Sequence, residues 1–124
     1  MPTTDSKTVL IVDDDRDLLD LLAFVLSSEG YDVETASDGR EALGSVEKAM
    51  PNLILLDMKM PVMNGWEFAE EFHERYDESA PIVVVTAAEN AAKRADEIHA
   101  SGWVSKPFDV VTLISVVRQR LASV

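Results

Sequence analysis

The stretch Val9-Leu-Ile-Val-Asp-Asp-Asp15 joins a short apolar run directly to three consecutive carboxylates. Two further uninterrupted apolar runs occupy residues 53–56 and 82–85, and a weaker one lies at residues 103–104. Continuous apolar runs of this length are typical of strands buried on both faces, as in a parallel sheet covered by helices. Residues 31–36 (YDVETA) alternate between apolar and polar side chains and therefore predict an edge strand.

Segments of helical length and pattern separate these runs. They predict helices over residues 16–28, 38–50, 65–76, 89–100 and 109–122. Gly30 suits the end of the first helix, and Asp109 suits the cap of the last. Parallel strands need right-handed crossovers through helices, so the alternation predicts an α/β fold. We expect a doubly wound (βα)5, flavodoxin-like domain, whose five-stranded parallel sheet has the order 2-1-3-4-5 and helices on both faces.

The composition narrows the class of protein. The 124 residues include 23 Asp and Glu against 11 Lys and Arg, a formal net charge of −12, and no Cys. A chain of this size is long enough to bury a hydrophobic core as one domain. We expect that domain to span residues 8–124 and to follow a flexible tail at residues 1–7. The acidic excess argues against direct binding to nucleic acid or anionic membrane, and the absence of Cys excludes thiolate chemistry. The longest apolar run, residues 21–26, is too short to span a membrane, so we expect a cytoplasmic protein.

Polar side chains follow the predicted strands where their carboxyl ends meet. Asp57 follows residues 53–56, Thr86 follows residues 82–85, and Lys106 follows the last strand. Ligands of doubly wound sheets bind at this edge, at the switch point in strand order. Carboxylates gathered there raise one another's pKa unless a cation intervenes, and Mg²⁺ accepts carboxylates together with a phosphoryl oxygen. The arrangement suits phosphoryl transfer to Asp57, with Lys106 neutralising charge and Thr86 donating its hydroxyl to the phosphoryl group.

Four motifs together, in this order and spacing, resemble the receiver domain of two-component response regulators. They are residues 9–14 (VLIVDD), 56–61 (LDMKMP) with Gly65 downstream, 85–87 (VTA) and 103–108 (WVSKPF), within a resemblance that covers Lys7 to Leu121. The resemblance implies a single-domain phosphoacceptor that receives its phosphoryl group from a histidine kinase or a histidine phosphotransfer protein. Such a domain promotes its own phosphorylation and dephosphorylation and is not an enzyme acting on other substrates.

The resemblance also implies roles for the residues that follow the first and third strands. Asp57 corresponds to the phosphoacceptor and is also a Mg²⁺ ligand. Asp14 corresponds to a direct Mg²⁺ ligand, Asp13 to a ligand acting mainly through water, and Met58 to a ligand through its carbonyl oxygen. Mg²⁺ is therefore the expected cofactor.

Further roles are implied for the residues around the phosphoryl group. Thr86 and Lys106 would hold its oxygens, and the Lys106–Pro107 peptide bond is expected to be cis. Thr86 and Trp103 would form the conformational switch, although Trp103 is bulkier than the Tyr, Phe or His usual at its position. Lys59 and Ala88 correspond to the variable positions that tune loss of the phosphoryl group.

The sequence leaves several alternatives open. A scaffold could keep this fold without phosphorylation, and a phosphatase of the haloacid dehalogenase type also uses Asp, Mg²⁺ and Lys, although Asp17 stands where its motif needs Thr. A flavin carrier would share the fold class, but three acids follow the first strand where a phosphate-binding loop is needed. We expect output through a protein partner of unknown identity on the face of the fourth helix, fifth strand and fifth helix. We expect a monomer or a weak dimer that forms through the same face. The candidate charge partners for such a dimer are Lys93, Arg94, Asp96 and Arg118.

Overall fold

The structure, a computed structural model, describes residues 6–122. The expected flexible tail therefore falls largely outside the described residues. Strands and helices alternate in the order β1 (Thr8–Val12), α1 (Arg16–Ser28), β2 (Asp32–Ala36), α2 (Gly39–Lys48), β3 (Leu53–Leu56), α3 (Gly65–Tyr76), β4 (Ile82–Thr86), α4 (Ala91–Glu97), β5 (Gly102–Ser105) and α5 (Val110–Leu121). The strands form one parallel sheet in the order β2-β1-β3-β4-β5, which confirms the predicted fold and the edge position of β2.

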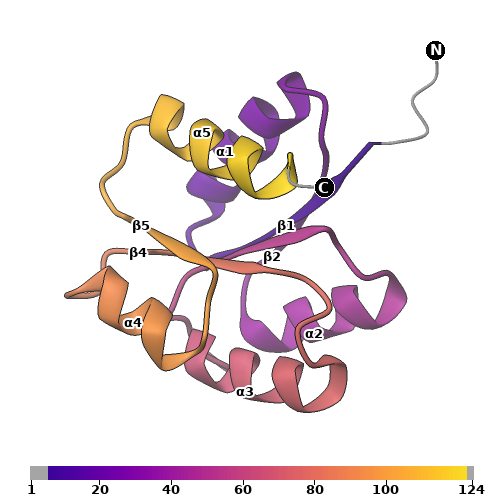
Figure 1. The fold of residues 1–124 in the computed structure, drawn as a ribbon, viewed down its shortest axis with the longest axis vertical. Helices are drawn as coiled ribbons and strands as arrows, with labels where there is room; N and C mark the ends of the chain where they lie inside the picture. Colours follow the sequence, from indigo (N-terminus) through magenta and orange to yellow (C-terminus); the bar gives the residue numbers. More distant parts are fainter. Residues whose placement is uncertain (1–5, 123–124) are drawn as a thin grey trace.

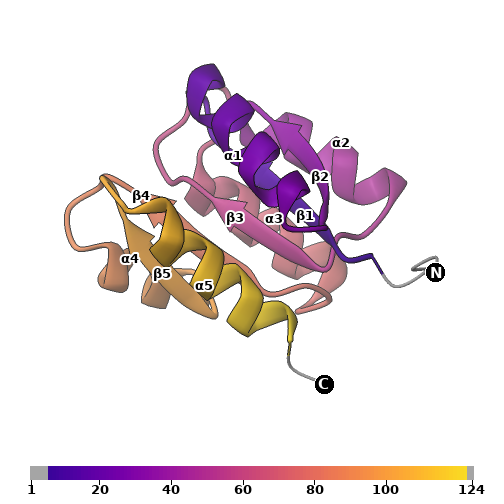
Figure 2. The same ribbon diagram turned by 90° about the horizontal axis from the view of Figure 1, so that it is seen from above.

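Helices cover both faces of the sheet. Helices α1 and α5 lie on one face, and α2, α3 and α4 lie on the other (Figures 1 and 2). Alternate residues of β1 supply the two cores, because successive side chains of a strand point to opposite faces. Val9 and Ile11 pack with α1 and α5, whereas Leu10 and Val12 pack with the helices opposite. The strand interiors are thus buried on both sides, as continuous apolar runs require.

The helix boundaries differ from the sequence predictions where a polar cap decides them. Helix α4 begins later than the predicted 89–100, because the Asn90 side chain accepts a hydrogen bond from the Lys93 N–H and caps the helix, and it also ends earlier, at Glu97. Asp38 likewise lies just outside α2, which was predicted to begin at residue 38. Its side chain caps the helix by accepting a hydrogen bond from the Glu41 N–H. Gly30, with φ of 98°, follows the end of α1 as predicted. No helix within residues 6–122 combines the length and apolarity needed to cross a membrane.

Candidate functional site

The acidic cluster lies where two neighbouring strands end. Strands β1 and β3 pair with Val12 opposite Leu56, so the next residues, Asp13 and Asp57, emerge side by side. Both are buried, with 3% and 6% of their surface exposed. One carboxylate oxygen each from Asp13, Asp14 and Asp57 lies within 4.8 Å of the others. The structure therefore brings together the three carboxylates that the sequence predicted to meet.

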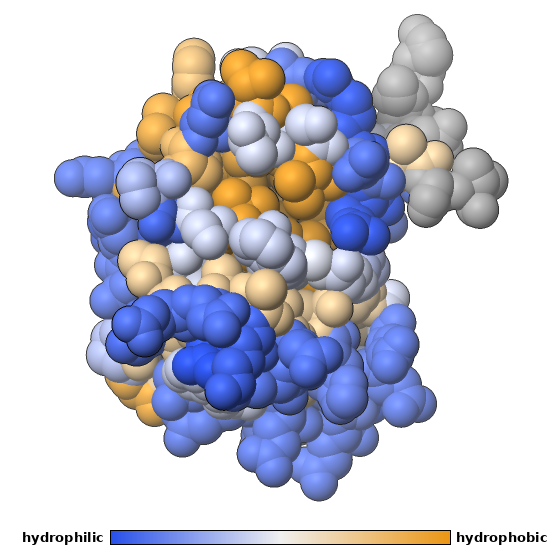
Figure 3. All heavy atoms as spheres, turned by 60° about the vertical axis from the view of Figure 1, so that its left-hand side comes forward, coloured by the Kyte–Doolittle hydropathy of each residue, from blue (hydrophilic) through white to orange (hydrophobic). Residues whose placement is uncertain are grey.

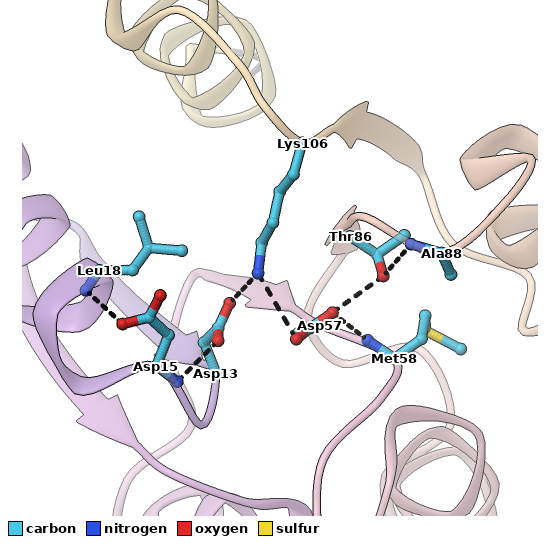
Figure 4. A network of polar contacts seen from close by, with 8 residues as sticks. All are labelled: Asp13, Asp15, Leu18, Asp57, Met58, Thr86, Ala88 and Lys106. Carbon is cyan, nitrogen blue, oxygen red and sulfur yellow. Dashed lines mark hydrogen bonds and ion pairs between the residues drawn. The ribbon is translucent and has the colours of Figure 1, made fainter.

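Lys106 reaches into this cluster from the segment after β5 (Figure 4). Its Nζ lies 2.6 Å from Asp13 Oδ2 and 3.5 Å from Asp57 Oδ2. The sequence predicted a positive charge here, but it did not identify Asp13 as the nearer partner. Residues 93 positions apart carry no local signal of such a pair, which depends on how the strand ends are placed.

The charges in the crevice perturb one another. Burial raises the pKa of Asp13 and the Asp57 charge adds to this, although hydrogen bonds from Lys106 and the Asp15 N–H oppose it. Burial by itself lowers the pKa of Lys106, but the hydrogen bond to Asp13 and the charges of Asp57 and Asp13 outweigh it, so the net pKa is raised. Lys106 is therefore held in its charged form, and the cluster keeps an excess of negative charge that a divalent cation would offset.

Asp57 accepts two hydrogen bonds on one carboxylate oxygen, while its other oxygen faces Lys106. Its Oδ1 accepts a hydrogen bond from the Met58 N–H at 2.8 Å and one from the Thr86 hydroxyl at 2.9 Å. Thr86 is the last residue of β4, so the strand ends one position later than the predicted run of residues 82–85, and Thr86 is 1% exposed. Its hydroxyl oxygen accepts from the Ala88 N–H at 3.2 Å. The main-chain donor of Met58 was missed from the sequence, because a backbone N–H leaves no mark on residue type.

The three consecutive acids divide between two roles. The Asp15 side chain accepts from Leu18 N–H and caps α1, while its own N–H donates to Asp13 Oδ1 at 2.9 Å. Asp13 and Asp14 face the crevice with Asp57. Helix capping, the ordinary use of an acid before a helix, thus accounts for one of the three and leaves two for the site.

The residues expected to tune loss of the phosphoryl group lie at the site, whereas the switch residue Trp103 lies away from it. Lys59 and Ala88 line a pocket of about 200 Å³ together with Asp57, Thr86 and Lys106. Trp103 is 50% exposed and lines a separate hollow between α4 and α5.

The structure bears on two further sequence predictions, the cis peptide bond and the charge partners of a dimer. The Lys106–Pro107 bond is cis, as expected. Of the candidate charge partners for a dimer, Arg94 pairs with Glu97 and Arg118 pairs with Glu29 within the chain. These two arginines already have an intramolecular carboxylate, which weakens their case as dimer contacts.

A doubly wound sheet with an acidic crevice and a lysine at its switch point defines the class of signalling receiver domains. The chain belongs to the response regulator receiver domain family, whose model matches residues 9–118. Members of this family act in two-component signalling as phosphoacceptors for histidine kinases or phosphotransfer proteins and are not classical enzymes.

Solved structures agree with this assignment. The chemotaxis protein CheY4 of Vibrio cholerae is 35% identical with a TM-score of 0.84, over 92% of this chain and 98% of that one. A putative response regulator from Chloroflexus aurantiacus is 30% identical with a TM-score of 0.86, over 96% and 100% of the two chains. The response regulator TrrA of Thermotoga maritima, solved in complex with Mg²⁺ and BeF, is 32% identical with a TM-score of 0.82, over 92% and 98%.

Proposed function

We propose that this domain accepts a phosphoryl group on Asp57 from a phosphohistidine of a histidine kinase or phosphotransfer protein, in a reaction that depends on Mg²⁺. One observation carries the proposal: the buried Asp57 carboxylate lies between the Thr86 hydroxyl and the Lys106 ammonium, beside the carboxylates of Asp13 and Asp14. This is the set of groups that phosphoryl transfer to a carboxylate requires.

The donor set suits a hard divalent ion. Carboxylate oxygens of Asp13, Asp14 and Asp57 would hold Mg²⁺ together with the Met58 carbonyl oxygen. That carbonyl accepts the Gly65 N–H at 2.9 Å and, having two lone pairs, can serve a second partner. Bound Mg²⁺ would neutralise charge on the carboxylates and on the phosphoryl oxygens.

In the transfer step, an Asp57 carboxylate oxygen forms a bond to phosphorus while the N–P bond of the donor breaks. The bonding pair stays on the imidazole nitrogen of the donor. Lys106 balances charge on the phosphoryl oxygens, and the Thr86 hydroxyl, which donates to Asp57 in this structure, turns to one of them. That turn would bias the face made by α4, β5 and α5, where Trp103 lies. The domain would promote gain and loss of its own phosphoryl group, with Lys59 and Ala88 tuning the loss.

Intact mass after incubation with acetyl phosphate tests the proposal. With Mg²⁺ we expect a gain of one phosphoryl group, mapped to Asp57, and with excess chelator we expect none, because the crevice then lacks the charge that offsets its carboxylates. A folded protein that binds Mg²⁺ but gains no mass from acetyl phosphate or from a phosphohistidine donor would favour the phosphorylation-independent scaffold.

One contact argues against the phosphatase alternative. That alternative needs the first and third acids of the triplet to act together, but the Asp15 side chain caps α1 by accepting the Leu18 N–H. Nothing in the described residues favours it over the receiver family.

Exposed apolar side chains lie on α1 and α5, the two helices that flank a groove leading to Lys106. Leu21 and Phe24 of α1 and Val111 of α5 are exposed by 47%, 73% and 73%. Hydrophobic residues gather over the end of the molecule formed by α1 and α5 (Figure 3). A groove of about 410 Å³ between these helices is lined by Leu21 and also by Lys106, which connects it to the site. This continuity supports contact of the donor protein with this surface.

Phe24→Ser should therefore slow transfer from a protein donor by about tenfold or more, because burying an aromatic side chain contributes roughly 1.5–3 kcal/mol. Labelling by acetyl phosphate should not change, since a small donor needs no docking surface. Met50→Ser, at another partly exposed apolar position away from the crevice, is the matched control. Equal slowing with both donors would show that Phe24 acts on the site and not on docking.

A further inference from the structure

The loop between β3 and α3 is held at two points. At its start, the Met58 carbonyl oxygen accepts the Gly65 N–H at 2.9 Å. Near its end, the Met63 carbonyl oxygen accepts the Gly39 N–H, also at 2.9 Å, from the first residue of α2. The position of the loop that carries Met58 therefore depends on a contact with a different helix.

Gly39 makes this contact possible through its lack of a side chain. A Cβ atom at Gly39 would lie 2.8 Å from the Met63 carbonyl oxygen and 2.7 Å from Met63 Cγ. The side chain of Met63 can move aside, but its carbonyl oxygen moves only with the loop. Gly39 is buried, so a larger residue has no open direction in which to shift.

The segment of the loop before this contact is strained. Val62 has φ of 66°, which a β-branched residue rarely adopts, and the Met63 N–H donates to the Pro61 carbonyl oxygen at 2.7 Å across it. The Val62 side chain is 72% exposed, so its burial does not offset the strain. Strained residues persist where the surroundings over-determine them, and the Gly39 contact with Met63 is such a constraint.

Residues 36–39, the segment that ends at Gly39, also support Asp13 on the β1 side of the acidic cluster. Ala36, the last residue of β2, accepts the Asp13 N–H at 3.0 Å. Between Ala36 and Gly39, the Ser37 N–H donates to Glu41 at 2.6 Å, and Asp38 caps α2. These bonds tie the short segment 36–39 to the first turn of the helix.

We propose that residues 36–39 form a brace that positions the two halves of the metal site relative to each other, with Gly39 as its positioning residue. The brace holds Asp13 through Ala36 and the Met58 loop through Gly39 and Met63. Coupling between two sites is reciprocal, so a bound ion held by Asp13 and Met58 would also stabilise the contact of Gly39 with Met63. This inference rests on the proposed Mg²⁺ site.

The test compares two Gly→Ala variants of the same helix. Gly39→Ala should weaken Mg²⁺ binding, measured by calorimetry on the unphosphorylated protein, by about tenfold or more, the usual range for groups that orient metal ligands. Gly44→Ala should change it by less than about twofold, because a Cβ there meets no atom within 4 Å. A folded Gly39→Ala protein that binds Mg²⁺ as tightly as the wild type overturns the proposal.

A second measurement on the wild type avoids any effect of the variant on folding. Mg²⁺ should slow hydrogen exchange of the Gly39 amide, which donates to Met63, and unchanged exchange at saturating Mg²⁺ overturns the proposal. Both readouts concern ion binding alone. A protein that binds Mg²⁺ but takes up no phosphoryl group would therefore contradict the proposed function and not the brace.

Discussion

Asp57→Asn should lower phosphoryl uptake from acetyl phosphate by more than about 1,000-fold, because removal of a nucleophile ordinarily costs several orders of magnitude in rate. The amide oxygen of Asn can still accept the hydrogen bonds that Met58 and Thr86 donate to Asp57. The change also removes one of the crowded negative charges at the crevice. The variant should therefore remain folded, with no loss in its free energy of unfolding, and intact mass should show only the unmodified chain.

The matched control is Asp20→Asn, which removes the same charge from an exposed position of α1 outside the cluster. It should take up one phosphoryl group at the wild-type rate. If Asp57→Asn still gains a phosphoryl group, peptide mapping identifies the acceptor. Modification of Asp13 or Asp14 at the wild-type rate would contradict the role assigned to Asp57.

Gly65→Ala should lower the free energy of unfolding by about 3 kcal/mol, a value at the upper end for overpacking. A Cβ atom at this position would lie 2.6 Å from the Asp57 carbonyl oxygen and 2.8 Å from Met58 Cα. Both are main-chain atoms, so relief requires movement of the backbone that carries the acceptor residue. Ala is the better helix former, so helix propensity acts in the opposite direction and cannot explain the loss.

Urea unfolding followed by circular dichroism measures this effect, with Gly44→Ala as the control. Position 44 lies inside α2 with open space around it, so Ala should raise the free energy of unfolding there, by up to about 1 kcal/mol. A Gly65→Ala protein with the unfolding midpoint of the wild type would show that α3 can move away from Asp57 at little cost.

Much of the fold follows from local sequence. The uninterrupted apolar runs predicted the buried strands, and β3 has the predicted bounds of Leu53–Leu56. The alternating stretch at 31–36 predicted an edge strand because one side of such a strand faces water, and β2 lies at the edge. Chain order and the handedness of crossovers then limit how parallel strands can be arranged.

The composition of the crevice was predictable for the same reason. Residues that follow parallel strands meet at one edge, so Asp13, Asp14 and Asp57 had to lie near one another once the strand order was known. The start of α4 was less predictable, because periodicity alone does not show that Asn90 caps the helix and lies outside it.

The sequence by itself determined the buried strands and the residue types at the carboxyl edge, because burial acts through local pattern, and it predicted the strand order that the structure confirms. Only the tertiary structure decided that Lys106 pairs more closely with Asp13 than with Asp57, and that Gly39 contacts Met63. Each of these contacts joins segments far apart in the chain over distances of a few ångströms. Such distances depend on how the packed helices and strands set the backbone, which no local pattern of residues encodes.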